Sequence, residues 1–234
     1  MASRIPFRNR AHEVSRIEAF SDVIFGFAVS LLVVSLEAPK NYEELIEMMR
    51  GLVPFGIAFF ILIDLWFEHY HYFRRYALHD SVTLTLNTIL LFVVLFYVYP
   101  LKFIFVLSLQ SVTGHASHIE HSQARTLFAI YGLGFALVFA ILGLMYRRAW
   151  ALRDELQLNE VERIDTLESI YDNFWSSIFG IVSMILGLTL PDGMIGLAGL
   201  VYFLLAVPKS LIPTIMRRKR RAAEERLLAP QTPG

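Results

Sequence analysis

Apolar segments long enough to cross a lipid bilayer recur six times along this chain of 234 residues. A helix of about 20 apolar residues spans the ~30 Å hydrocarbon core, because each residue adds about 1.5 Å. We predict membrane helices at residues 20–36, 52–72, 81–109, 126–146, 169–190 and 194–216. The sequence therefore predicts an all-α integral membrane protein. One transmembrane domain, residues 1–216, is followed by a basic tail, residues 217–234, which we expect to be partly disordered.

The basic residues are distributed unevenly, although the formal net charge is zero. Arg and Lys gather before the first apolar segment, between the second and third, between the fourth and fifth, and after the sixth. The loops on the other side contain few of them. Because cytoplasmic loops are enriched in Lys and Arg, this pattern places both termini in the cytoplasm. An even number of membrane helices also puts both termini on one side.

Enzymatic activity is not favoured by the residues present. The chain has no cysteine, which excludes disulfides and thiolate metal or redox chemistry. The only cluster of candidate catalytic groups, Asp64 to His71, lies within about two turns of one helix and has no second element converging on it. No hydrolase, kinase or metalloprotease motif accompanies it. We predict no enzyme, no cofactor and no nucleic-acid partner.

Polar residues stand at the start of the first apolar segment, in Arg16-Ile-Glu-Ala-Phe20-Ser21-Asp22. A charge at the centre of a membrane helix costs roughly 2.5–3.5 kcal/mol on insertion scales, so such a residue usually has a partner and a role. Two interpretations remain open on these residues alone. The segment belongs to an ion pathway, or it forms a polar clasp between helices.

Three short patterns occur in order along the chain: RxxxFSD at residues 16–22, WxxH at residues 66–69, and LN followed by P at residues 86–100. Together they resemble signatures of the transmembrane protein 175 family of potassium channels. The resemblance covers about the first half of the sequence. Chains with one signature and six helices resemble the prokaryotic members, which assemble as homotetramers. The resemblance therefore implies a homotetramer in the plasma membrane of a prokaryote, in contact with membrane lipid and potassium ions.

The resemblance also implies that the first helix lines a central pore. It places an apolar constriction at Phe27 and a hydroxyl layer at Ser30. At 100° per residue, Phe27, Ser30, Leu31 and Val34 share one helix face. Without the resemblance, the same apolar stripe is more simply explained as helix packing.

The function implied is a passive, potassium-permeable cation channel. No TVGYG-like sequence is present for a carbonyl filter, whereas a narrow apolar ring can gate by dewetting. Hydroxyls are weak ligands, so we expect a modest preference for K⁺ over Na⁺. Phe27 is bulkier than the residue usual in the family. Whether it closes the pore or moves the constriction to Leu31 or Val34 stays open.

The remaining signature residues are assigned to a structural clasp that holds the first helix against the second and third: Arg16, Phe20, Ser21, Asp22, His69 and Asn87. Asp22 lies about 140° around the helix from Phe27, so it does not face the same axis. We expect it to pair with Arg16 or with polar groups of the neighbouring helices. His69 and Asn87 are expected to make interhelical hydrogen bonds to this region.

An alternative function rests on Asp64, a carboxylate in the middle of the second predicted helix. A proton-coupled secondary transporter would use such a residue, but the inverted repeats and broken helices of transporters are not evident in the sequence. Three outer-loop histidines spaced by three, His115, His118 and His121, are the only candidates for a divalent metal. We predict that they are solvated and hold none.

Overall fold

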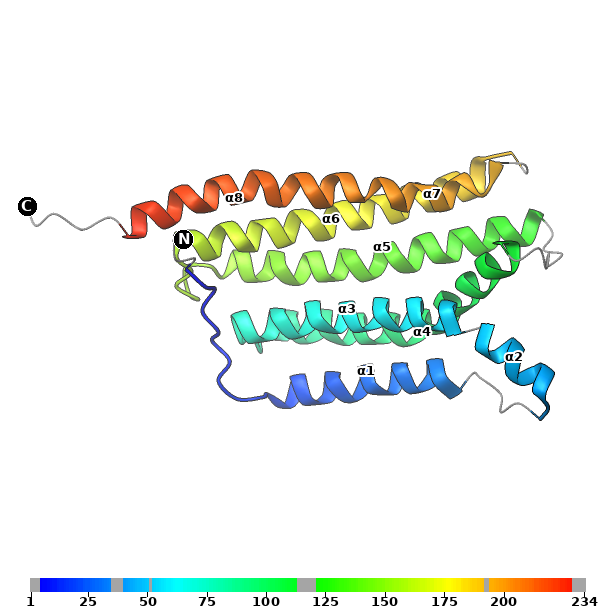
Figure 1. Cartoon of the computed structure of the whole chain (residues 1–234). Helices are drawn as coiled ribbons and strands as arrows, with labels where there is room; N and C mark the ends of the chain where they lie inside the picture. Colours follow the sequence, from blue (N-terminus) through cyan, green and yellow to red (C-terminus); the bar gives the residue numbers. More distant parts are fainter. Residues whose placement is uncertain (1–4, 35–39, 51, 113–120, 192–193, 229–234) are drawn as a thin grey trace, which may run out of the picture.

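The computed structural model describes residues 5–34, 40–50, 52–112, 121–191 and 194–228, and the regular elements within these ranges are all helices. These elements include six long helical bodies, of which the last is interrupted. Figure 1 shows how they are arranged. They are α1 (Arg16–Val34), α3 (Leu52–Tyr76), α4 (Ser81–Val112), α5 (His121–Ala151), α6 (Glu160–Thr189), and α7 (Leu197–Leu204) continued by α8 (Ala206–Leu228). The short α2 (Tyr42–Arg50) lies between α1 and α3. The predicted all-α class and the number of long helices are confirmed.

Three helices of the described part are long and apolar enough to cross a membrane by length and composition alone. They lie at Ser81–Leu101, Gln123–Ala151 and Leu197–Leu228. The other long helices have charged side chains in a terminal turn: Glu18 in α1, Arg74 and Arg75 in α3, and Glu160 and Glu162 in α6. These charges shorten the apolar part of each helix.

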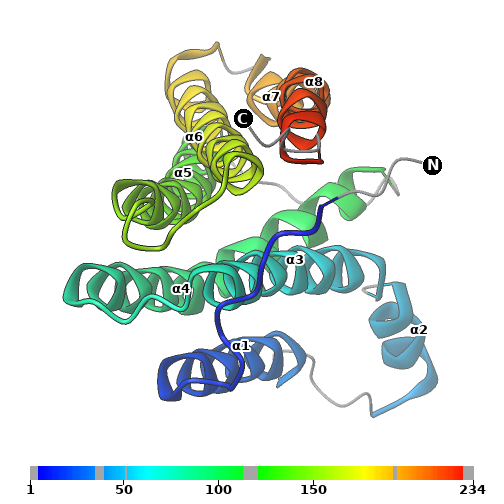
Figure 2. The ribbon, with the colours of Figure 1, turned by 90° about the vertical axis from the view of Figure 1, so that its left-hand side faces the viewer.

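The helices form two groups, which Figure 2 shows along their length. One group contains α1, α3 and α4, with α2 at its edge, and the other contains α5, α6, α7 and α8. Contacts between α4 and α5 join the groups. The α4 helix contains Pro100, and its last third bends toward α5, as expected when proline interrupts the helical hydrogen bonds (Figure 1). Tyr131 of α5 donates a hydrogen bond to the Pro100 carbonyl.

The closest helix packing is between α5 and α6. A Cβ atom placed on Gly132 would lie 2.7 Å from the carbonyl oxygen of Gly180, and one placed on Gly180 would lie 2.8 Å from the Ala136 backbone nitrogen. Ser177 adds a hydrogen bond from its Oγ to the Ala136 carbonyl at 2.9 Å. Small residues allow two helix backbones to approach in this way in membranes.

The last helical body differs from the single helix predicted at residues 194–216. It has a turn at Leu205, where the backbone N–H donates to Tyr202, three residues earlier. Pro208 explains the interruption, because it has no N–H to donate four residues back and its ring crowds that carbonyl. From there α8 continues as a helix through the basic run to Leu228, past the predicted domain boundary.

An extended segment, residues 5–11, crosses the end of the molecule at which arginines gather, and we call it the N-terminal strap. Arg8 and Arg10 donate side-chain hydrogen bonds of 2.8–2.9 Å to Glu162 at the start of α6. The Arg10 and Ala11 amides donate to the Arg74 carbonyl of α3 at 3.0 and 3.3 Å. The strap therefore ties the two helix groups together immediately before α1 begins.

Glu162 is the centre of this contact and lies outside the predicted membrane helices. Its side chain is fully buried and also caps α6, because Asn159 and Glu162 exchange side-chain and backbone hydrogen bonds. Burial alone would raise the pKa of Glu162. Hydrogen bonds from Arg8, Arg10 and two backbone amides outweigh that effect and lower the pKa to about 2.

Candidate functional site

A chain of hydrogen bonds links α1 to α3 and α4 through three buried polar side chains. The Asn87 amide donates to Ser21 Oγ at 3.0 Å, and its oxygen lies 2.8 Å from His69 Nε2. All three side chains are buried. Polar groups in an apolar interior are stable only with partners, so each residue fixes the positions of the other two. We call this set the polar clasp.

His69 is held in a defined orientation inside the clasp. Its ring lies between Phe25 of α1 and Phe73 of α3, at centroid distances of 5.4 and 4.8 Å. Because the amide oxygen of Asn87 can only accept a hydrogen bond, Nε2 of His69 carries a proton in this arrangement. The clasp thus combines a directional polar contact with aromatic packing.

Asp22 is bound from α3 and not by Arg16. The indole Nε1 of Trp66 donates to Asp22 Oδ1 at 2.7 Å. Arg16 is exposed, and the described residues include no ion pair between it and Asp22. Six residues separate the two, which places them about 240° apart around the helix and so on different faces. Of the two pairings expected for Asp22, the one with Arg16 is corrected in favour of a group on the neighbouring helix.

Trp66 was missing from the predicted site residues. The WxxH spacing was a usable signal, because residues at i and i+3 project from one face of a helix, so that Trp66 and His69 reach α1 together. Glu18 was also missed. It is buried, and Glu18 and Ser15 exchange hydrogen bonds at 2.8 and 3.2 Å, which fixes the first turn of α1.

The opposite face of α1 is exposed and mostly apolar. It carries Phe20, Val23, Phe27 and Ser30, and we call these four residues the α1 stripe. The assignment of Phe20 to the clasp is corrected, because its side chain lies on the exposed face. Phe20 and Phe27 are 61% and 54% exposed, whereas Phe25, Ala28 and Leu32 on the other side of the helix are buried in the core. The described chain therefore leaves the stripe uncovered along its length.

Ser30 is the one hydroxyl on the stripe. Its Oγ donates to the Gly26 carbonyl at 2.9 Å, so the proton is directed back along the helix and the oxygen lone pairs remain available as acceptors. Leu31 lies at the border, half-buried and packed against the core. Val34 is the last residue of α1, and its side chain lies outside the described residues.

Asp64 does not join the clasp. Asp64 is exposed on α3 and makes no hydrogen bond or ion pair within the described ranges. His115 and His118 lie outside those ranges, as does the side chain of His121. Among the side chains that are described, no group of three or more metal-ligating residues comes together.

These features define a class of protein. It is an all-helical membrane protein whose first long helix is held by buried hydrogen bonds on one face and presents an uncovered apolar stripe with a hydroxyl on the other. Comparisons with known proteins make the class specific. The family model described as "Endosomal/lysosomal potassium channel TMEM175" matches residues 16–97, which include the clasp and the stripe.

Relatives from two bacteria are similar over long stretches. A potassium channel from Marivirga tractuosa is 37% identical over 228 residues, 92% of each chain. A potassium channel from Chamaesiphon minutus is 26% identical over 172 residues, 68% of this chain and 77% of the relative. The chain therefore belongs to the TMEM175 family, whose members are channels and not enzymes.

A solved structure agrees in fold over nearly the whole chain. A crystal structure of a point variant of the potassium channel MtTMEM175, in complex with a nanobody fusion protein, superposes with a TM-score of 0.80 at 35% identity. It covers 93% of this chain and 100% of that one. The lysosomal potassium-selective channel homologue from Chamaesiphon minutus shares the fold, with a TM-score of 0.59 at 20% identity, covering 86% of this chain and 99% of that one.

Proposed function

We propose that this protein is a potassium channel that conducts passively across a prokaryotic plasma membrane. In the proposal it is a homotetramer with both termini in the cytoplasm, and the α1 stripe of each subunit lines a central pore. The observation that carries it is the division of α1 into a clasped face and an uncovered face. The potassium channels among its relatives give the permeant ion.

Asp64 supports assembly with further copies. An exposed carboxylate in the middle of a membrane helix is costly against lipid. The same surface of α3 exposes Phe60 (71%) and Phe67 (47%). Facing another subunit or an aqueous crevice removes the penalty for Asp64.

The proposed conduction mechanism rests on Phe27 and Ser30. Four Phe27 rings around an axis form a narrow apolar neck, and such a neck excludes water and ions until it widens. One turn further along α1, the lone pairs of four Ser30 hydroxyls replace part of the hydration shell of K⁺. Because hydroxyl oxygens are weaker ligands than a cage of carbonyls, selectivity for K⁺ over Na⁺ is modest.

Ion flux into liposomes tests this function against the transporter alternative. The purified protein is reconstituted, and K⁺ and Na⁺ fluxes are measured down matched gradients with and without a proton gradient. A channel gives K⁺ flux that exceeds Na⁺ flux, does not saturate at low concentration and is unaffected by the proton gradient. Saturable uptake that requires the gradient and disappears in Asp64→Asn would contradict the proposal and favour a coupled transporter.

A further inference from the structure

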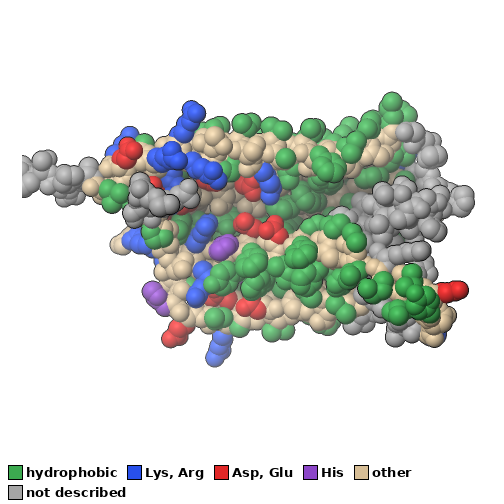
Figure 3. Space-filling model, viewed as in Figure 1, with side chains coloured by type: hydrophobic (Ala, Val, Ile, Leu, Met, Phe, Trp, Pro, Cys, Tyr) green, Lys and Arg blue, Asp and Glu red, His purple; other side chains and the backbone are tan. Residues whose placement is uncertain are grey.

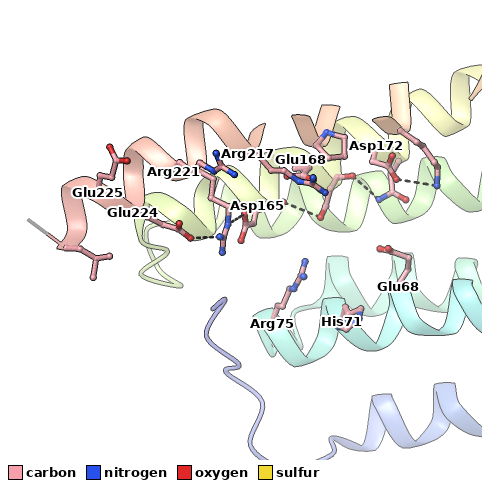
Figure 4. A pocket seen from close by; sticks show the side chains of 16 residues that line it. Glu68, His71, Arg75, Asp165, Glu168, Asp172, Arg217, Arg221, Glu224 and Glu225 are labelled. Carbon is pink, nitrogen blue, oxygen red and sulfur yellow. Dashed lines mark hydrogen bonds and ion pairs between the residues drawn. The ribbon is translucent and has the colours of Figure 1, made fainter. Parts of the chain in front are cut away.

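A cavity of about 920 Å³ lies at the arginine-rich end, between α3, α6 and α8. Figure 4 shows that Glu68 and Arg75 point from α3 toward the wall that carries Glu168 and Arg217. Charges of both signs therefore face each other across the space. The conduction proposal gives this cavity no role.

Several of the lining charges are neutralised within the chain. Arg220 of α8 pairs with Asp165 at 2.9 Å and with Glu224, and Lys209 lies 3.6 Å from Asp172. These contacts join α8 to α6 and form one side of the cavity. Because these charges are paired within the chain, they do not require a charged ligand.

A second set of lining charges is left without ion pairs in the described part of the chain. Glu168 and Arg217 lie on one wall, and Arg75 and Glu68 on the other, where Glu68 accepts a hydrogen bond from Tyr146 at 3.2 Å. Burial raises the pKa of Glu168, nearby Asp165 adds to the effect, and Arg217 offsets only part of it. An additional cation beside Glu168 would therefore be stabilised. Arg217 and Arg75 are correspondingly available to an anion.

Apolar side chains lie beside Lys209, one of the residues that line the cavity. The ammonium of Lys209 lies 5.8 Å from the centre of the Phe139 ring, and Phe139 packs against Phe135, which packs against Tyr202. Figure 3 shows the hollow between the upper and lower helices, with red and blue side chains toward the arginine-rich end and green side chains beyond them. A charged mouth followed by an apolar wall matches the shape of a phospholipid.

The positions of Glu168 and Arg217 in the sequence match the depth of the headgroup layer. Glu168 immediately precedes the predicted membrane helix at 169–190, and Arg217 immediately follows the one at 194–216. We propose that this cavity binds a phospholipid of the cytoplasmic leaflet whose headgroup is phosphoethanolamine. Its ammonium contacts Glu168 and Glu68, and its phosphate contacts Arg217 and Arg75. The proposal rests on the topology given under the proposed function.

Charge complementarity selects this headgroup among common ones. Phosphatidylglycerol offers a phosphate but no cation for the two glutamates. Phosphatidylcholine offers a cation whose methyl groups remove all N–H donors, so it cannot hydrogen-bond to a carboxylate. Phosphatidylethanolamine supplies a phosphate and three N–H donors, and charge-assisted hydrogen bonds are about twice as strong as neutral ones.

Native mass spectrometry of the intact assembly tests the proposal, with the three lipids added at equal concentration. Wild-type protein is expected to retain phosphatidylethanolamine about fivefold more than phosphatidylcholine, the effect of roughly one charge-assisted hydrogen bond at a partly hydrated site. Glu168→Gln should remove this preference. Arg217→Gln should lower retention of all three lipids. Arg218→Gln is the matched control, because it removes one positive charge from α8 outside the cavity lining.

Three outcomes would overturn the proposal. They are equal retention of the three lipids by wild type, equal loss in Arg217→Gln and Arg218→Gln, and no retained lipid in the intact assembly because a neighbouring copy fills the cavity. Glycerophosphoethanolamine, which has the headgroup without acyl chains, distinguishes a membrane phospholipid from a soluble ligand with the same headgroup. Its displacement of the lipid at equal concentration would point to a soluble ligand instead. The binding measurement requires no ion flux, so its failure and a failure of the conduction proposal are separable.

Discussion

The two helix groups are held together by different means. In the α1, α3 and α4 group, the contact of α1 depends on hydrogen bonds among Ser21, His69 and Asn87. In the α5 and α6 pair, two backbones meet at Gly132 and Gly180 over a long contact. A helix that must leave one face free cannot be enclosed by packing on all sides. The position of such a helix is specified by a few hydrogen bonds. A helix that need not leave a face free is instead fixed by the close approach of its backbone to that of a neighbouring helix.

Removing the centre of the polar clasp is expected to give the largest effect. Asn87→Ala leaves the Ser21 hydroxyl and the His69 N–H buried without partners, at about 1–3 kcal/mol each, so we expect a loss of about 3 kcal/mol in the free energy of unfolding. Thermal unfolding in detergent measures it. Thr88→Ala, an exposed neighbour, is the control. Equal stability of the two variants would show that the clasp does not hold α1.

The contact between the groups predicts a pH dependence centred on Glu162. The folded-state pKa of about 2 lies below the usual value of 4.5, so the stabilisation is fully present above pH 4.5 and is lost as the pH falls toward 2. The shift corresponds to about 3 kcal/mol. Glu162→Gln should lower stability at neutral pH and flatten the melting-temperature profile between pH 5 and 2. A profile as steep as that of wild type would assign the acid sensitivity elsewhere.

Within the packed group, adding one methyl group separates two glycines. Gly180→Ala places a Cβ 2.8 Å from a backbone atom and is expected to destabilise by about 2 kcal/mol, after the gain in helix propensity is subtracted. Gly143→Ala meets its nearest atom at 3.4 Å, an ordinary contact, and should be neutral or stabilising by up to about 1 kcal/mol. Guanidinium unfolding of both variants measures the difference. Similar results for the two would mean that α5 and α6 do not depend on close approach.

The smallest expected change concerns the bond between Trp66 and Asp22. Trp66→Phe keeps an aromatic ring but removes the 2.7 Å hydrogen bond, and we expect a loss of about 1 kcal/mol because both groups are accessible to water. The double variant, Trp66→Phe with Asn87→Ala, tests whether the two contacts are independent, because its loss in stability is compared with the sum of the two single losses. Additive losses would mean that Asp22 and the clasp hold α1 separately, and a combined loss well below the sum would mean that they act as one unit.

The sequence predicted the parts of this molecule that depend on periodicity and on the cost of buried polarity. Long apolar runs gave the all-α class, and the requirement that polar groups in such runs find partners pointed to Ser21, His69 and Asn87. The partner of Asp22 was predicted only as a choice. The hydrogen bond that Asp22 accepts from Trp66 depends on where α3 lies relative to α1.

Other parts could not be read from the chain. The N-terminal strap is extended and has no periodic pattern, and its attachment to Glu162 joins residues about 150 positions apart. The cavity at the arginine-rich end exists because α3 and α8 stay apart there, which no local motif encodes. Pro208 was visible in the sequence, but the apolar run around it favoured a continuous helix.

Potassium flux in two matched phenylalanine variants tests most directly whether the free face of α1 lines the pore. Phe27→Ala and Phe92→Ala each truncate an exposed ring, one on the α1 stripe and one on α4. We expect Phe27→Ala to raise the passive K⁺ flux into liposomes several-fold and Phe92→Ala to leave it near the wild-type value. Wild-type flux in Phe27→Ala, or an equal change in both variants, would contradict the assignment of the pore to α1.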